Sequence, residues 1–195
     1  MAKNQFNRDF DEVKRDGMAL QYVKEQSAEI CMEAVRQNGM ALQFVEEQTA
    51  EICMAAVQQR GYALRYVKEQ DPEICMAAVR QDGNALGYVQ EQSPEICMEA
   101  VRQKGTALAY VKEQAPEICM EAVCQKGDAL AFVQEQTPEI CKAAVRQNSN
   151  ALKYVQSQFR DEVREASKEV NRWDAAIEEA LEAAEIPEPE LGMEM

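Results

Sequence analysis

The sequence predicts an all-α protein, an α-solenoid of short helical hairpins with two helices in each 22-residue repeat. Three observations support this prediction: a fixed glycine spacing, apolar residues of helical period, and a recurring helix-start signal. Glycine recurs every 22 residues at Gly17, Gly39, Gly61, Gly83, Gly105 and Gly127, and Ser149 takes the seventh place. A unit of this length cannot bury its apolar residues alone, so neighbouring repeats must stack.

The first helix expected in each repeat has one apolar face. In residues 84–92 (NALGYVQEQ), the residues Ala85, Leu86, Tyr88 and Val89 fall within an arc of roughly 160° at the helical period. The pattern predicts an amphipathic α-helix of period 3.6. A leucine and an aromatic residue recur at the same places in the other repeats, so the same helix is expected in each.

The second helix begins with a clear start signal, as in SPEICMEAVRQ at residues 93–103. Ser93 is a favoured N-cap residue, Pro94 suits the first helical position, and Glu95 complements the positive helix end. The recurring proline also argues against one continuous helix of 11-residue hendecads. Glycine then closes the helix, where we expect a positive φ. The solenoid is expected to be right-handed or nearly straight.

The two ends of the chain depart from the repeat. We expect an N-terminal capping helix at residues 1–16, six full repeats plus a half at 17–158, a long amphipathic C-terminal capping helix at 159–186, and an acidic tail at 187–195. In the first of these, Arg8 and Asp9 replace the Ile and Cys of the repeat, which predicts a more polar outer face.

The chain contains seven cysteines and no histidine. The absence of histidine excludes Ser-His-Asp and Cys-His catalysis and most types of zinc site. Six cysteines lie at the centre of the apolar arc and are expected to be buried structural thiols: Cys31, Cys53, Cys75, Cys97, Cys119 and Cys141. Cys124 lies on the polar arc and is expected to be exposed. We therefore expect no catalytic, cofactor-binding or metal-binding residues; an enzyme using surface carboxylates or Cys124 is the weakest alternative.

The charge also restricts the partners. The formal net charge is −14, which disfavours nucleic acid, because phosphate binding needs clustered lysine and arginine. No apolar run approaches the roughly 20 residues that cross a membrane, and the first residues lack the apolar stretch of a secretory signal peptide. We expect a protein partner, no nucleic acid and no membrane insertion, with a monomer favoured.

A recurring glutamine ends the first helix of each repeat and falls inside its apolar arc. We predict a structural ladder in which these amides bond backbone groups of neighbouring repeats. Its members are Gln26, Gln48, Gln70, Gln92, Gln114, Gln136 and Gln158. At the end of the second helix, Arg102 and Gln103 are expected to face solvent.

Positions that differ between repeats are free to meet a partner. Three such positions in the first helices are predicted to line one surface of the solenoid, and its N-terminal half carries the more adhesive side chains. The predicted partner-binding residues are Met18, Met40, Tyr62, Arg65 and Lys68. The alternative is neutral drift of solvated positions.

The pattern A-L-x-[YF]-V-x-E-Q-[ST]-P-E-I-C-x-x-A-V-x-[QK]-x-G over residues 17–158 resembles the domain of unknown function 4116 family. The resemblance implies tandem helical repeats of a kind found in proteins of intracellular bacteria, secreted effectors among them, and of some protists. It implies no activity and no catalytic residues.

The acidic tail has a resemblance of its own. Residues 173–195 hold eight acids and no base, and Glu178, Glu179 and Glu182 form an E-E-x-x-E block with Leu191 after it. This looks like the glutamate-rich secretion signal of Dot/Icm-type type IV effectors. The resemblance implies a protein made in the bacterial cytoplasm and delivered into a host cell, where it binds a host protein. The alternatives are a cytosolic bacterial adaptor or structural repeat protein without secretion, and a solvated acidic helix end.

Overall fold

The computed structural model describes residues 2–168, a part of the chain that contains helices and no strand. α-Helices alternate with short 3₁₀ helices, labelled η. The α-helices are α1 (Ala2–Arg15), α2 (Ala28–Gln37), α3 (Ala50–Gln59), α4 (Pro72–Gln81), α5 (Pro94–Gln103), α6 (Pro116–Gln125) and α7 (Pro138–Gln147). The 3₁₀ helices are η1 (Gly17–Tyr22), η2 (Gly39–Phe44), η3 (Gly61–Tyr66), η4 (Gly83–Tyr88), η5 (Gly105–Tyr110), η6 (Gly127–Phe132) and η7 (Ser149–Tyr154). The predicted all-α solenoid of 22-residue units is confirmed.

The first helix of each repeat is a 3₁₀ helix of six residues, so the predicted α-helix is wrong in type. Short 3₁₀ helices place residues i and i+3 on the same side. In η4, Gly83 and Leu86 are accordingly both buried, and the N–H of Val89 donates to the carbonyl of Leu86. The side chain of Asp82 caps this helix by accepting a hydrogen bond from the N–H of Asn84.

The second helix of each repeat forms as predicted. In α5, the Ser93 hydroxyl accepts a hydrogen bond from the N–H of Ile96 at 3.3 Å, and Pro94 occupies the first turn. Equivalent caps are supplied by Ser27, Thr49, Asp71 and Thr137. At α6 the N-cap is Ala115, which offers no side-chain hydrogen bond.

The repeated glycines serve close packing rather than an unusual backbone. No glycine in residues 2–168 has a positive φ, which corrects the expectation from the helix-end pattern. A Cβ added to Gly83 would lie 2.5 Å from the carbonyl oxygen of Ala100, in the α-helix of the same repeat. Only glycine permits this contact. Ser149 takes the seventh place, where the helix that follows, from residue 157, no longer keeps the repeat pattern.

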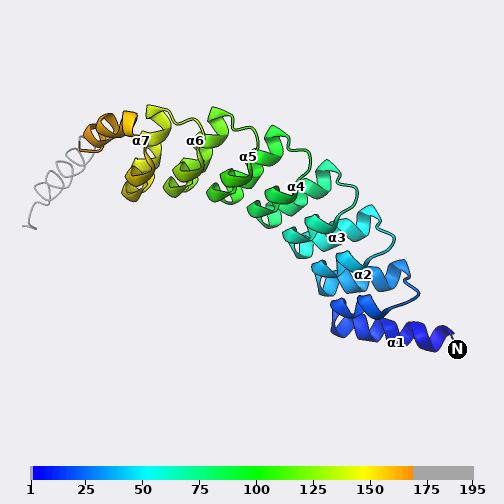
Figure 1. Ribbon diagram of the computed structural model, residues 1–195. Coiled ribbons are helices and arrows are strands. Elements are labelled where there is room, and N and C mark those ends of the chain that lie inside the picture. Colours follow the sequence, from blue (N-terminus) through cyan, green and yellow to red (C-terminus); the bar gives the residue numbers. More distant parts are fainter. Residues whose placement is uncertain (1, 169–195) are drawn as a thin grey trace, which may run out of the picture.

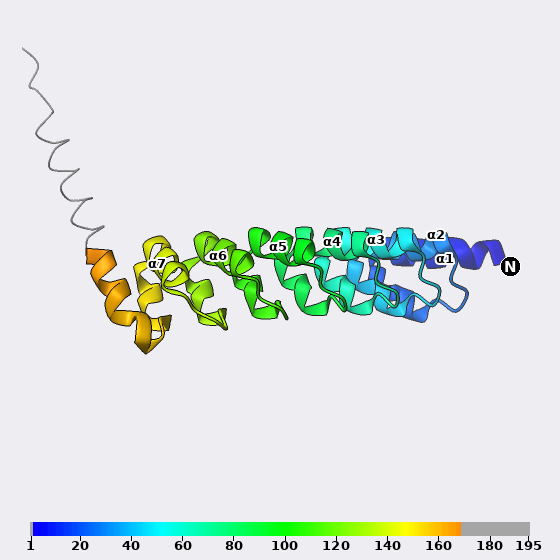
Figure 2. The same ribbon diagram turned by 90° about the horizontal axis from the view of Figure 1, so that it is seen from above.

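The helices form two layers, with the α-helices in one and the η helices in the other (Figure 2). The row of repeats bends into an arc, and each α-helix runs from its convex to its concave side (Figure 1). The linkers from η to α therefore lie at the outer rim of the arc, here called the convex edge. The turns from α to η, such as residues 103–105, lie at the inner rim, here called the concave edge.

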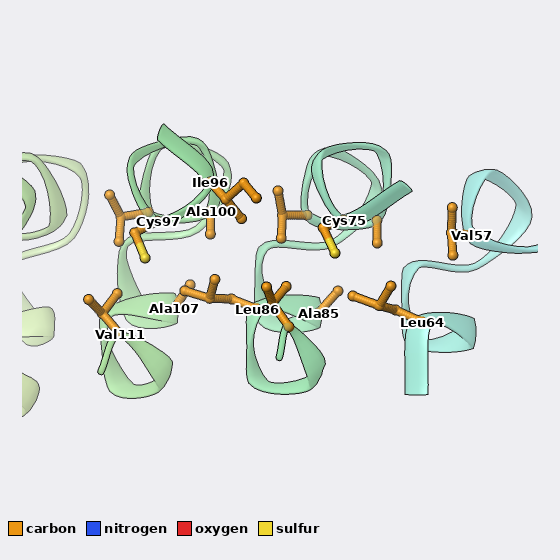
Figure 3. Packing of buried hydrophobic residues seen from close by; sticks show 14 of the residues in the cluster. Val57, Leu64, Cys75, Ala85, Leu86, Ile96, Cys97, Ala100, Ala107 and Val111 are labelled. Carbon is orange, nitrogen blue, oxygen red and sulfur yellow. The ribbon is translucent and has the colours of Figure 1, made fainter. Parts of the chain in front are cut away.

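The core lies between the two layers (Figure 3). Leu86 and Ala100 are fully buried there, while Cys75 and Cys97 point from their α-helices toward the η layer. Because the same small and medium side chains recur in each repeat, the core is one continuous strip along the arc.

The two ends close this strip. In α1, Val13 is fully buried and Asp9 is only 9% exposed, its carboxylate accepting a hydrogen bond from Gln5 at 2.7 Å. The predicted exposed polar face is therefore wrong at Asp9. A helix beginning at residue 157 continues to residue 168 and buries Val163 completely. No helix of the described part is long and apolar enough to span a membrane.

Candidate interaction surfaces

Glutamines of the convex edge join each repeat to the next. The amide nitrogen of Gln92 donates to the carbonyl of Tyr110 at 2.9 Å, and its oxygen accepts from the N–H of Lys112 at 3.0 Å. Gln26, Gln48, Gln70, Gln114 and Gln136 bond in the same way. The predicted ladder is confirmed for these six convex-edge glutamines. Gln158 does not join it, since its amide donates to the Gln156 side chain.

A second set of glutamines, at the concave edge, joins the two helices of each repeat. The side-chain oxygen of Gln103 accepts a hydrogen bond from the N–H of Gly83 at 2.8 Å. The same bond recurs at Gln37, Gln59, Gln81, Gln125 and Gln147. Gln103 is exposed, as predicted, and this hydrogen bond is an additional role that the prediction did not include. Both rims of the solenoid are held by side-chain amides.

The six register cysteines belong to this scaffold. Cys97 is 4% exposed, and its thiol donates to the side-chain oxygen of Gln92 at 3.6 Å. Burial raises the pKa of Cys97, and it raises the pKa of Cys141 to about 11. Thiols that stay protonated are poor nucleophiles, so the structural interpretation is confirmed. Cys124 is exposed, as predicted.

Grooves recur between repeats along the convex edge. One of about 510 Å³ is lined by Gln48, Cys53, Gln70 and Ile74, and two between later repeats measure about 480 and 290 Å³. Their walls are thus the residues that hold the repeats together. Among residues 2–168 no three His, Cys, Asp or Glu side chains are grouped to hold a metal ion.

The predicted partner-binding residues fall into two groups. Met18, Met40 and Tyr62 are half-buried at the second position of their η helices, and Met18 packs against the core. The Tyr62 ring instead meets the edge of Tyr88, with centroids 5.8 Å apart. These three side chains are therefore partly covered by the solenoid, and their role in binding stays a prediction.

The remaining predicted residues are exposed. The Arg65 guanidinium lies 5.1 Å from the centroid of the Tyr66 ring and 5.8 Å from that of Tyr88. The Lys68 ammonium donates to the carbonyl of Glu46 at 2.8 Å. Glu178, Glu179, Glu182 and Leu191 lie outside the described residues.

The structure identifies a surface that the sequence reasoning missed. Tyr88, Tyr110 and Phe132, here called the aromatic row, end successive η helices and are 36%, 46% and 41% exposed. Gly87, Ala109 and Ala131 precede them and are too small to cover the rings. A Cβ at Gly87 would already lie 3.0 Å from the Tyr110 ring. The most exposed run of apolar side chains is therefore in the C-terminal half of the η layer, not in the N-terminal half.

The signal for this row was present in the sequence. The residue after the repeated leucine is Gln21, Gln43 and Arg65 in the first three repeats, glycine or alanine at Gly87, Ala109 and Ala131, and Lys153 in the last half repeat. On a helical wheel of period 3.6 the aromatic residues fall on the buried arc, so the wheel does not predict that their side chains are exposed. Each of these aromatic residues instead ends its η helix at the surface.

With this geometry established, the comparison with known families is direct. The model of the domain of unknown function (DUF4116) matches residues 13–49, 27–70, 49–93 and 71–114, which together span more than half of the chain. The chain belongs to this family. Residues 115–158 continue the same DUF4116 repeat in sequence and structure. No curated protein and no solved structure matches the chain. The family description carries no activity, so function must be argued from the surfaces.

Proposed function

We propose that the chain is a non-enzymatic scaffold that binds a partner protein through the aromatic row. The supporting observation is the exposure of Tyr88, Tyr110 and Phe132 at the ends of three successive η helices. Aromatic side chains are enriched in interfaces because they bury much area and lose little conformational entropy. An exposed run of them marks an interaction surface.

The frame that presents this row is rigid by construction. The side chain of every buried polar residue in the described part has a hydrogen-bond partner, and both rims are bridged by glutamines. A surface held in one conformation loses little entropy when a partner binds. The arrangement therefore favours recognition over catalysis.

Affinity capture with the full chain tests this role. The bait is compared with a variant carrying Tyr88→Ser, Tyr110→Ser and Phe132→Ser, using lysate of a cultured eukaryotic cell and quantitative mass spectrometry. We expect the variant to lose the captured protein. The matched control is Tyr22→Ser, which removes an aromatic side chain that is 76% exposed but lies outside the row. An unchanged catch from the triple variant would contradict the proposal.

A second variant examines the residues predicted from the sequence. It carries Tyr62→Ser, Arg65→Ser and Lys68→Ser. If this variant loses the captured protein while the aromatic-row variant retains it, the interface lies in the N-terminal half of the η layer instead.

We further propose that the scaffold is an effector delivered from a bacterium into a host cell, where the partner is a host protein. Membership of the repeat family and the acidic block at Glu178, Glu179 and Glu182 support this proposal. The test is a translocation reporter fused to the chain with and without residues 173–195, in a bacterium with a Dot/Icm-type system. Transfer of the full-length fusion alone is expected. Without transfer, a cytosolic adaptor role is favoured, and equal transfer of both fusions would remove the tail from the proposal.

A further inference from the structure

The charges of this acidic chain are separated between its two rims. At the concave edge, taken as the last turn of each α-helix and the first residues of the η helix after it, cations outnumber anions. The cations there are Lys14, Arg15, Arg36, Arg60, Arg80, Arg102, Lys104, Lys126 and Arg146, and all are exposed. The anions there are Glu12, Asp16, Asp82 and Asp128. The inner rim of the arc is therefore basic although the net charge is −14.

The convex edge has the opposite composition. Its linkers and first helical turns contain Glu25, Glu29, Glu46, Glu47, Glu51, Glu69, Asp71, Glu73, Glu91, Glu95, Glu113, Glu117, Glu135 and Glu139. Its cations are Lys24, Lys68 and Lys112. Because the α-helices all run from the convex to the concave side (Figure 1), the two sets of charges lie at opposite rims.

The helix macrodipole explains only part of this separation. Acids in the first turn and bases in the last turn both stabilise an α-helix. Arg60, Lys104 and Lys126, however, follow the last turn and occupy the N-cap position of η3, η5 and η6. At the equivalent place Asp16, Asn38, Asp82 and Asn148 cap their η helices with a side-chain hydrogen bond. The three cations form no such bond.

Three of the seven turns have thus exchanged a capping hydrogen bond for an exposed cation. Among the nine concave-edge cations, Arg80 pairs with Glu99 at 3.0 Å and Arg102 with Glu121 at 3.6 Å. The other seven form no ion pair within residues 2–168, so their charge is available. A row of uncompensated charge of one sign attracts and orients a partner of the other sign.

We propose that the concave edge binds an acidic segment of the partner protein. This inference rests on the proposed scaffold function and names the chemistry of its partner. Adjacent packed helices lie roughly 8–10 Å apart, and an extended chain advances about 3.3 Å per residue. An extended segment with a carboxylate at every third residue would therefore place one carboxylate beside one cation of each repeat.

Nucleic acid fits this edge less well. Phosphates follow one another more closely than one per repeat, and their binding requires clustered cations. Here the cations are spaced one or two to a repeat with Asp16, Asp82 and Asp128 among them, and the opposite rim is strongly acidic. An acidic polypeptide can adapt its carboxylate spacing to the repeat, whereas a phosphodiester chain cannot.

The test uses the full chain and two fluorescent 15-residue peptides of identical composition, in about 50 mM salt to limit screening. One is (Gly-Ser-Glu)5, with a carboxylate at every third residue, and the other has its five glutamates consecutive. We expect the spaced peptide to bind to the unaltered chain. A triple variant that carries Arg60→Glu, Lys104→Glu and Lys126→Glu should bind this peptide about tenfold more weakly, or weaker still. The control, Lys24→Glu with Lys68→Glu and Lys112→Glu, changes net charge equally at the convex edge and should change binding less than about twofold.

The position of the bound peptide is mapped on the unaltered chain with a carbodiimide, which joins a carboxylate directly to a nearby lysine. We expect the spaced peptide to be linked to Lys104 and Lys126 in the unaltered chain. Equal linking of Lys24 and Lys112, an equal loss of affinity in the two variants, or equal affinity for the two peptides would overturn the proposal.

Two further outcomes would assign the edge to another occupant. Tighter binding of a 15-nucleotide poly-uridine would favour nucleic acid. Peptide binding that appears only after Glu185→Gln and Glu188→Gln would mean that the acidic tail of this chain occupies the edge. Loss of protein capture by the aromatic-row variant is independent of peptide binding, so each proposal can fail separately.

Discussion

Glycine and glutamine residues decide how closely the helices of the solenoid approach one another. Gly83→Ala would drive a methyl group to 2.5 Å from the Ala100 carbonyl, and the main chain there cannot move without separating η4 from α5. We expect the free energy of unfolding to fall by about 3 kcal/mol, measured by urea denaturation. Gly87→Ala is the matched control, because its new contact is with the movable Tyr110 ring at 3.0 Å. A similar loss from both substitutions would contradict this account.

The convex-edge glutamines make a smaller contribution. Gln92→Leu keeps the size of the side chain but leaves the Tyr110 carbonyl and the Lys112 N–H without their partner. We expect a loss of about 1 kcal/mol, because two hydrogen bonds between repeats are lost at an exposed edge where water can replace them. The melting temperature and the urea midpoint should both fall. Gln90→Leu, at an exposed position in the same linker, should leave both nearly unchanged.

At the scale of one element, the uncapped helix α6 provides a direct test. Ala115 has the extended backbone of the other N-cap residues but lacks a hydroxyl or carboxylate. Ala115→Ser should therefore add the bond that Ser93 makes in α5 and stabilise the chain by about 1 kcal/mol. Ser93→Ala should remove a similar amount, and calorimetric melting of both variants measures the difference. A lower melting temperature for Ala115→Ser would contradict the capping assignment.

The sequence predicted the α elements better than the η elements, and the reason is physical. Proline and Ser93-type caps fix where an α-helix starts, whatever surrounds it. The choice between α and 3₁₀ over six residues depends on how tightly the following α-helix packs, through contacts such as Gly83 with Ala100. The aromatic row and the concave-edge glutamines depend on the same packing. The exposed aromatics and the amides that face a neighbour could therefore not be identified from one repeat's helical wheel.

At the scale of the whole molecule, each repeat contacts only its two neighbours. Among residues 2–168, each α-helix contacts only the adjacent α-helices and the adjoining η helices. Such solenoids behave as a sum of units and nearest-neighbour interfaces. The arc seen in Figure 1 is then the sum of one small rotation per repeat.

This organisation predicts that a whole repeat can be removed. Deleting residues 61–82 joins Arg60 to Gly83 in unchanged register. Gln48, which bonds Tyr66 and Lys68, then meets the equivalent backbone groups of Tyr88 and Gln90 across the new junction. We expect a folded chain with the same helix content per residue by circular dichroism and a single melting transition. Deleting residues 61–71 removes half a unit and should abolish the cooperative transition. Survival of both deletions would contradict nearest-neighbour stacking.

The modular repeats also determine how many binding positions the concave edge has. Because its cations recur at most once or twice per repeat, duplication or loss of one repeat would change the number of binding positions in fixed steps without altering their spacing. The chain would then distinguish partners by the length of their acidic segments. Selection could adjust that length through repeat number alone, with no substitution in any contact residue.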